Sequence, residues 1–233
     1  MAHYDNFTTW FFDAATTEVH WAQGLKDVLE WTDEEVIRLS GAPARSTLSI
    51  ARFDLDEDEG TGIRLTVQNP ILLDEPMIRD VIITEKGIVV SHIVRNQIFN
   101  LRPEFRGMKL GPRSCAIEIS QAKEFDFDFI DVWAVGNAAS SKDRQDQFAM
   151  SGFAVWPRLG FDGDIPTQVL AKMPPSLSQR GLTKVSQLMA FKEGVEFWDV
   201  HGDECRLRFD LSDATCWKTL NSYLMISNIQ VQI

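Results

Sequence analysis

The chain has 233 residues, of which 44% are hydrophobic and 24% charged, and its formal net charge is −11. This length and this balance are typical of a folded protein with a sizeable core. An acidic surface repels phosphate backbones, so the composition argues against direct binding of nucleic acid. The same charge would suit a partner that carries an amine, such as a basic peptide, or it would serve solubility alone.

Nothing in the sequence indicates a membrane segment or an oxidising compartment. No apolar run is long enough to span a bilayer, and the first residues lack the basic and apolar pattern of a signal peptide. The cysteines, Cys115, Cys205 and Cys216, show no paired spacing, and the histidines and carboxylates form no ligand cluster. We therefore expect a cytoplasmic protein with reduced thiols, no disulfides and no metal site.

The first region, residues 1–45, is predicted to be mostly helical. Apolar residues recur at helical spacing in residues 18–31. Residues 32–35, Thr-Asp-Glu-Glu, have the form of a capping box that opens a helix ending at Gly41. The aromatic run at residues 7–12 could form an early strand ahead of these helices.

The middle region, residues 46–163, is predicted to contain a largely antiparallel sheet that leads into a glycine-containing loop. β-branched and aromatic residues favour strands at residues 46–53, 63–68, 77–84 and 88–94, with a further strand-like run at residues 97–101. The loop at residues 105–113 reads Phe-Arg-Gly-Met-Lys-Leu-Gly-Pro-Arg. After it, apolar residues return at helical spacing, at Ile117, Ile119, Ala122 and Phe125.

The last region, residues 164–233, is predicted to be a small α+β extension. It contains an expected helix at residues 178–191, a hairpin made by residues 195–200 and 205–211, and a last helix capped by Ser212. The predicted fold class is therefore α/β (α+β), with a mixed, mainly antiparallel sheet flanked by helices.

The loop at residues 105–113 is the first candidate for a ligand site. A strand that turns through glycines into a helix leaves free N–H groups at the positive end of the helix dipole, where a phosphate can bind. An ordinary strand-to-helix turn would have the same sequence. What favours the ligand site is the order of later segments: a buried strand at residues 129–137, then Arg-Leu-Gly-Phe at residues 158–161.

This series of motifs resembles the GCN5-related N-acetyltransferase (GNAT) family over residues 47–163. Members carry an Arg/Gln-x-x-Gly-x-Gly/Ala loop that cradles the pyrophosphate of coenzyme A, and Arg106, Lys109 and Gly111 align with it. The resemblance implies a GNAT-like acyl-CoA-binding core and an N-acyltransferase that moves an acyl group from acetyl-CoA, or another acyl-CoA, to an amine. The cofactor-binding residues implied are Phe99, Leu101, Arg106, Gly107, Met108, Lys109, Leu110, Gly111, Arg113 and Asn137.

The chain departs from the family pattern at two aligned residues and in one link. Lys109 replaces the first loop glycine, and its side chain would either crowd the pyrophosphate or pair with a phosphate. Trp156 stands where many members have the tyrosine that protonates the departing thiolate, and an indole N–H does not readily give up its proton. The link at residues 138–150 is longer than in the family.

The chemistry implied is attack of a neutral amine on a thioester, which requires a base and an oxyanion donor. The donor would be a backbone N–H near residues 99–101. The base candidates are His92, Glu104 and Asp131, and Tyr223 could replace the missing acid. Each of these side chains also has a structural interpretation, in packing, capping or solvent contact.

Trp133 and Trp156 could shape an acyl or substrate pocket, or simply fill the core. The remaining tryptophans are interpreted as packing or self-association anchors, so a homo-oligomer stays open. Two further hypotheses stand beside the acyltransferase. One is a catalytically degenerate binding or assembly protein on the same scaffold, and the other is a transferase that uses a different donor.

Overall fold

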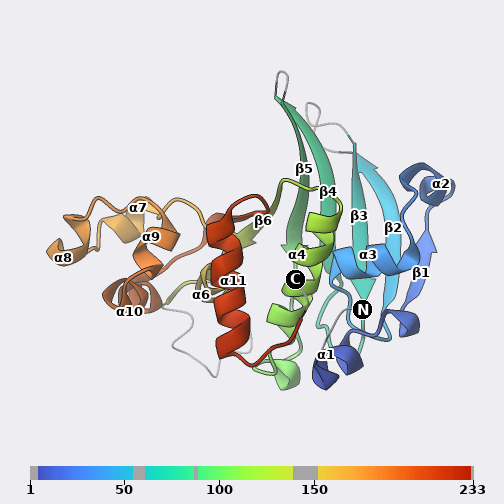
Figure 1. Cartoon of the computed structure of the whole chain (residues 1–233), viewed down its shortest axis with the longest axis horizontal. Helices are drawn as coiled ribbons and strands as arrows, with labels where there is room; N and C mark the ends of the chain where they lie inside the picture. Colours follow the sequence, from blue (N-terminus) through green and yellow to red (C-terminus); the bar gives the residue numbers. More distant parts are fainter. Residues whose placement is uncertain (1–4, 55–60, 87–88, 139–151, 232–233) are drawn as a thin grey trace. The chain divides into compact units, whose positions relative to one another are not determined.

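The computed structural model describes residues 5–54, 61–86, 89–138 and 152–231. They form a mixed α/β architecture in which a mixed sheet is flanked by helices (Figure 1). The chain makes two compact units, one of Met1–Ile130 with Leu224–Ile233 and the other of Asp131–Tyr223. Among the described residues, no helix has both the length and the apolar character needed to cross a membrane.

The first unit is built on strands that follow one another in chain order. Strands β1 and β2 are parallel, and each later pair is antiparallel. The register places Leu65 opposite both Ile50 and Arg79, and Arg79 opposite Asn96, so these side chains share one face. The strands are β1 (Glu18–Trp21), β2 (Thr47–Asp54), β3 (Thr61–Gln68), β4 (Met77–Lys86) and β5 (Val89–Ile98). The predicted antiparallel strands are thereby confirmed.

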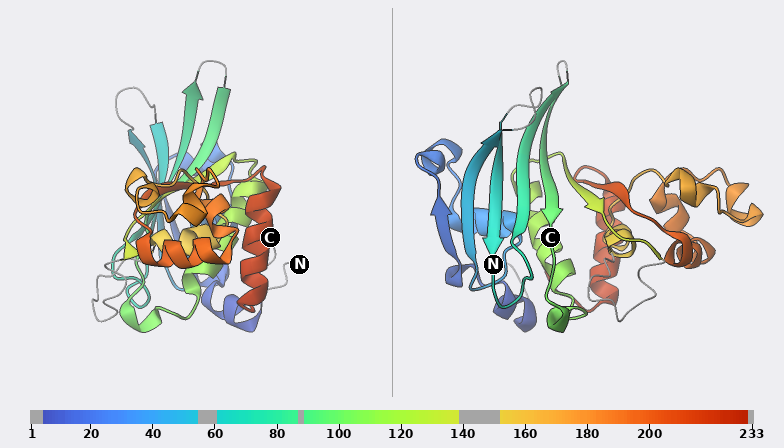
Figure 2. Two further views of the ribbon diagram at one scale, coloured as in Figure 1. Left: turned by 90° about the vertical axis from the view of Figure 1, so that its left-hand side faces the viewer. Right: turned by 180° about the vertical axis from the view of Figure 1, so that it is seen from behind.

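Helices of the first unit cover one face of these strands. Figure 1 shows α3 and α4 in front of the sheet, and the right-hand view of Figure 2 shows the strands from behind, with no described helix over that face. Leu48, Leu65 and Val67 of the covered face are fully buried. The helical elements are α1 (Asn6–Phe11), η1 (Ala14–Thr16), α2 (Leu25–Leu29), α3 (Asp33–Ser40), η2 (Pro103–Phe105) and α4 (Leu110–Glu124).

Helix α3 begins and ends as its sequence predicts. The Thr32 hydroxyl accepts a hydrogen bond from the Glu35 N–H at 3.2 Å, and the Glu35 carboxylate accepts one from the Thr32 N–H at 2.7 Å. Gly41 ends the helix with a φ of 64°. A Cβ atom there would lie 2.5 Å from the Ser114 hydroxyl of α4, so this close helix contact requires glycine.

Two expectations for the first region are wrong. Residues 18–31 form the short strand β1 and the helix α2 rather than one helix, because Gly24 takes a left-handed φ of 71° and β1 pairs with β2. Residues 7–12 lie mostly in α1 rather than in a strand. Asp5 caps this helix by accepting the Thr8 N–H at 2.7 Å, and local capping outweighs the β propensity of the aromatic run.

The second unit packs short helices around an aromatic core. The fully buried Trp198 donates its indole N–H to the Phe153 carbonyl at 2.8 Å, and Phe161 packs against Phe209 with ring centroids 5.5 Å apart. β6 begins at the end of the first unit, and the last residues of α11 return to that unit. The elements are β6 (Phe129–Ala134), α6 (Gly152–Arg158), α7 (Thr167–Leu170), α8 (Pro175–Ser178), α9 (Val185–Met189), α10 (Lys192–His201), β7 (Cys205–Asp210) and α11 (Ala214–Ile226).

The hairpin expected in the last region is wrong, because residues 195–200 belong to α10. In this helix Phe197 and Trp198 turn inward while Lys192 and Glu196 remain exposed at an i, i+4 spacing. The helix expected at residues 178–191 is also wrong, since α8 and α9 are separate. The last helix is confirmed, but the side chain that accepts from its first turn is Asp213, 2.7 Å from the Thr215 nitrogen, rather than Ser212.

Candidate functional site

The loop between β5 and α4 has an unusual backbone. After Ile98 the chain makes an isolated bridge from Leu101 to Leu73 and the short helix η2. Gly107 then takes a φ of 82° and Lys109, the N-cap of α4, takes a φ of 60°. A lysine in the left-handed region is uncommon, so the loop holds this conformation through its surroundings.

This backbone leaves amide donors at the start of α4. In the part of the chain that the structure describes, the following backbone N–H groups have no hydrogen-bond acceptor: those of Gly107, Lys109, Leu110 and Gly111. The first bond inside the helix runs from the Arg113 N–H to the Lys109 carbonyl at 3.4 Å. Successive free N–H groups in a loop with left-handed residues, at the positive end of a 15-residue helix, favour an anion.

Arg106 holds the loop through bonds to residues earlier in the chain. Its Nε donates to the Leu101 carbonyl at 2.8 Å, and its Nη2 lies 3.2 Å from the Asn100 side-chain oxygen and 3.4 Å from Asp74. These bonds hold the guanidinium against the residues that follow β5. Arg106 therefore braces the turn into Gly107.

Arg113 lies in the first turn of α4 and is buried, with 6% of its surface exposed. Its Nη1 donates to both carboxylate oxygens of Asp5, at 2.7 and 2.8 Å, and also to the Thr8 hydroxyl. Burial raises the pKa of Asp5, but the hydrogen bonds from Arg113 and from the Gln230 and Thr8 backbone outweigh it and hold that pKa well below its usual value. The charge of Arg113 is thus balanced within the protein.

Lys109 is the loop residue whose charge is not balanced by a carboxylate. Its Nζ donates to the Ser227 carbonyl at 2.8 Å, and within the described ranges it forms no ion pair. A neutral carbonyl satisfies one of its donors and leaves the positive charge in place. Lys109 is exposed, and whether its side chain pairs with a phosphate or crowds it stays a prediction.

The other predicted residues of the first unit differ in burial and in their distance along the chain from this loop. Glu104 is exposed in η2, Met108 is partly exposed, and Leu110 is buried with 2% of its surface accessible. Phe99 is half-buried and lies 3.4 Å from where a Cβ of Gly111 would stand. His92 of β5 lies opposite Ile83 of β4, and its side chain lies outside the part of the chain that the structure describes.

The remaining predicted residues belong to the second unit. Asp131 in β6 is 2% exposed, and its carboxylate accepts from Arg206 and from the Arg208 Nε at 2.9 Å. Trp133, on the same strand, is 55% exposed. Trp156 packs edge-on against Phe161, with centroids 4.9 Å apart.

The last two predicted residues of this unit lie at its boundaries in the sequence. Asn137 follows β6, and Tyr223 is half-buried near the end of α11. The structure therefore brings Asp131 to two arginines, whereas in the described part of the chain Trp133, Trp156 and Tyr223 form no hydrogen bond with it.

A buried polar cluster at the middle of α4 was not predicted. Arg79 and Glu118 are both fully buried, with 3.2 Å between the Arg79 Nε and the Glu118 Oε1, and the Asn96 amide donates to Glu118 at 3.1 Å. Burial raises the pKa of Glu118 to about 7 against the opposing effects of Arg79 and Asn96. The available signal was Glu118 itself, a carboxylate between Ile117 and Ile119 in the predicted helix.

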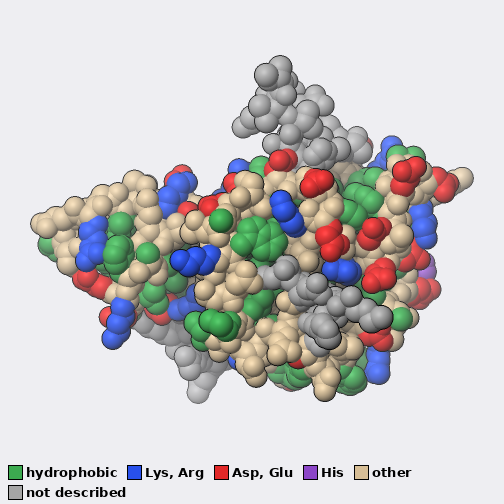
Figure 3. All heavy atoms as spheres, in the orientation of Figure 1, with side chains coloured by type: hydrophobic (Ala, Val, Ile, Leu, Met, Phe, Trp, Pro, Cys, Tyr) green, Lys and Arg blue, Asp and Glu red, His purple; other side chains and the backbone are tan. Residues whose placement is uncertain are grey.

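A groove of about 530 Å³ lies beside α3 and has acidic and apolar walls. Phe12, Ile37 and Ile117 line it together with Asp13 and Glu34, which form no ion pair in the described part of the chain. Figure 3 shows acidic side chains gathered over α3. The lining also contains Asp33 and one cation, Arg38, so the groove is acidic on balance, which favours cations.

Comparisons with family models, with curated proteins and with solved structures found no match.

Proposed function

We propose that the protein binds an acyl-CoA through the loop from Gly107 to Gly111 and transfers the acyl group to an amine. The observation that carries this proposal is the set of N–H groups without acceptors at the start of α4, beside the unbalanced charge of Lys109. A pyrophosphate presents several acceptor oxygens and negative charge, which match these donors.

The residues of the loop divide into binding and bracing roles in this proposal. The N–H groups and the Lys109 ammonium would bind the pyrophosphate. Arg106 and Arg113, which the family resemblance assigned to the same anion, would instead hold the loop and the first turn of α4, because their guanidinium groups bond to Leu101 and Asp5. The ion pairs of Arg106 with Asp74 and of Arg113 with Asp5 reduce the field that these two charges add at the loop.

Acyl transfer would follow a simple balance of bonds. A bound acyl-CoA supplies a thioester carbon that is open to nucleophilic attack. A neutral amine forms the new carbon–nitrogen bond as the carbon–sulfur bond breaks, and the proton that the amine loses balances the charge of the departing thiolate. The negative charge near α3 favours the approach of a protonated amine, which must give up one proton before it reacts.

Asp131 is proposed as the ion-pair partner of Arg206 and Arg208 rather than as the base, since both oxygens of its carboxylate already accept hydrogen bonds from these arginines. His92 and Glu104 stay proposed bases in the first unit, and Tyr223 stays a proposed acid. The binding-only hypothesis on the same scaffold has one observation in its favour, the neutralisation of Arg113 by Asp5.

Replacing Lys109 tests the binding site. We expect Lys109→Ala to weaken coenzyme A binding by about tenfold, the size of one charge-assisted hydrogen bond to phosphate. Titration calorimetry with coenzyme A and acetyl-CoA measures this change. Lys123→Ala is the matched control, because it removes the same charge from the last turn of the same helix.

Equal affinities of the two variants would contradict binding at the loop. A screen of amine acceptors with acetyl-CoA then separates transfer from binding alone. Coenzyme A binding at the loop without turnover on any amine would favour the binding or assembly protein.

A further inference from the structure

A short segment after α11 lies against the anion loop. Its residues, Ser227–Val231, are here called the strap, and Figure 1 shows it beside the start of α4. Ile229 and Val231 are 5% and 9% exposed, so two apolar side chains seat the strap on the first unit. The Ser227 carbonyl accepts from Lys109 at 2.8 Å, which connects the strap directly to the loop.

Asp5 joins the strap to α4. Its backbone N–H donates to the Gln230 carbonyl at 3.1 Å, and its carboxylate accepts the Gln230 N–H at 2.9 Å. The same carboxylate accepts two bonds from Arg113. One anionic side chain therefore holds together the start of α1, the first turn of α4 and the strap.

We propose that Asp5 and the strap form an internal lock on the anion loop, in which the Asp5 carboxylate competes with a bound pyrophosphate for the positive end of α4. The inference rests on the proposed function, because it concerns the same loop and the same class of ligand. It adds a regulatory element. Breaking the bonds between Asp5, Arg113 and the strap would strengthen pyrophosphate binding, and pyrophosphate binding would weaken those bonds.

The competition follows from charge. Arg113 is three residues beyond Leu110, so Asp5 neutralises a cation within the first turn of a helix whose pitch is about 5.4 Å. A pyrophosphate at the loop and the Asp5 carboxylate would both lie near the first turn of α4, where two negative charges repel each other and added salt screens the repulsion. A pyrophosphate at the loop therefore raises the free energy of the Asp5 carboxylate.

Lys109 transmits the same competition to the strap. Its ammonium donates to the neutral Ser227 carbonyl, and a phosphate oxygen is a stronger acceptor for a charged donor. A ligand that takes over this bond removes one contact of the strap. Thermodynamic linkage then requires that each event oppose the other by the same factor.

The test compares Asp5→Asn with Asp27→Asn, which makes the same charge change on the exposed face of α2. Titration calorimetry with inorganic pyrophosphate is the measurement. We expect Asp5→Asn to bind about fivefold or more tighter than the wild type, with the gain shrinking as salt is added. Asp27→Asn should stay within about twofold, since long-range surface charge is screened.

If a folded Asp5→Asn variant binds pyrophosphate no more tightly than the wild type, the lock is overturned. Binding of pyrophosphate by the wild type would still support the loop as a site. Absence of binding to every variant would overturn both the loop and the lock. Hydrogen exchange on the unaltered protein is the second measurement, in case Asp5→Asn does not fold. Pyrophosphate should speed exchange at the Gln230 amide, and unchanged or slower exchange would overturn the lock.

Discussion

Helix α4 carries two arginine–carboxylate pairs whose carboxylates behave in opposite ways. Asp5 accepts well-placed hydrogen bonds from Arg113 and two backbone amides, and its pKa lies well below the usual value. Glu118 lies deeper, receives one amide bond from Asn96, and has a pKa raised to about 7 by burial. Both carboxylates face an arginine, so the difference lies in burial, which is complete at Glu118, and in the hydrogen bonds that outweigh the lesser burial of Asp5.

The two pairs also differ in what they hold together. The Arg79–Glu118 pair joins β4 to the middle of α4 inside the core. The Arg113–Asp5 pair joins α4 to α1 and the strap at its start. A buried pair of the first kind stabilises little yet is costly to break. The Arg113–Asp5 pair differs because its carboxylate is partly exposed and also bonds to the strap.

The largest expected effect comes from removing Arg79. Arg79→Met would leave Glu118 as an unpaired buried charge, and we expect a loss of about 3–5 kcal/mol in the free energy of unfolding at pH 8. Chemical denaturation measures the loss. At pH 5 the loss should be smaller, because Glu118 is protonated there, and an equal loss at both pH values would contradict the raised pKa.

The next effect is the pH dependence of stability. The pKa of Glu118 is about 7 in the folded protein against an ordinary value of 4.5, so the folded state holds its proton more tightly. Stability from this group is present below pH 4.5 and is lost as the pH rises through 7, by about 3 kcal/mol in all. Denaturation between pH 5 and pH 8 should show this slope, and Glu118→Gln should abolish it.

The carboxylates with lowered pKa values do not change the stability of the protein between pH 5 and pH 8. Asp5, Asp33, Glu35 and Asp210 all have lowered values. Their contribution to stability is present above the unfolded pKa and is lost only as the pH falls further, below about 4. A slope between pH 5 and pH 8 that survives in Glu118→Gln would therefore point away from Glu118.

The smallest effect on stability is expected at Asp5. Asp5→Asn keeps the side-chain shape but weakens the bonds to Arg113, and we expect a loss of about 2 kcal/mol. The loss should be constant from pH 5 to pH 8, since the carboxylate is ionised throughout. Thermal unfolding of the variant beside Asp27→Asn measures it, and a loss that changed with pH in this range would contradict the assignment.

Sequence patterns predicted the helices and strands whose formation depends on residues close in the sequence. The capping box at residues 32–35, the antiparallel strands and α4 all follow from periodicity and turn residues close in the sequence. Residues 18–31 and 195–200 were mispredicted because their conformations depend on partners elsewhere. β1 pairs with β2 some thirty residues later, and Trp198 packs on Phe153.

At the candidate site, too, contacts with residues far away in the sequence could not be predicted. Its backbone was predictable, since Gly107 and Gly111 flank the start of a helix, but its charge balance was not. Arg113 is neutralised by a residue 108 positions earlier, and Lys109 contacts one 118 positions later. The roles of His92, Glu104 and Tyr223, and the three regions bounded at residues 45 and 163, stay predictions.

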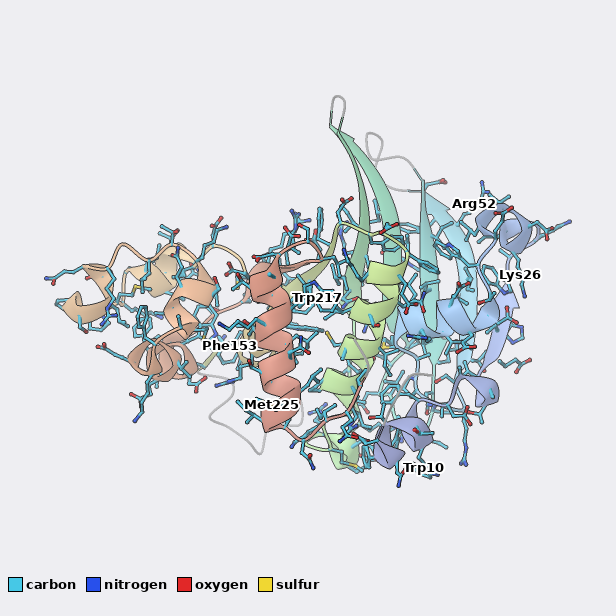
Figure 4. The ribbon with its side chains drawn as sticks, in the orientation of Figure 1. Trp10, Lys26, Arg52, Phe153, Trp217 and Met225 are labelled. Carbon is cyan, nitrogen blue, oxygen red and sulfur yellow. The ribbon has the colours of Figure 1, made fainter. Side chains whose placement is uncertain are left out.

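Exposed apolar side chains distinguish the surface near α1 and α11. Trp10 is 64% exposed on α1 and Met225 is 75% exposed near the end of α11 (Figure 4). Trp10 lies 5.9 Å beneath the Arg45 guanidinium, a contact that partly shields its ring. The self-association expected from the tryptophans stays a prediction that light scattering across a concentration series would test.

Amide chemical shifts give the most direct test of the central claim, that the free N–H groups at the start of α4 bind a pyrophosphate. Coenzyme A is titrated into the isotope-labelled protein, with pantetheine, which lacks the diphosphate, as the control. We predict the largest shifts at Gly107, Lys109, Leu110 and Gly111 with coenzyme A, and none there with pantetheine. Unchanged amides at these residues, or equal shifts with both ligands, would contradict the account.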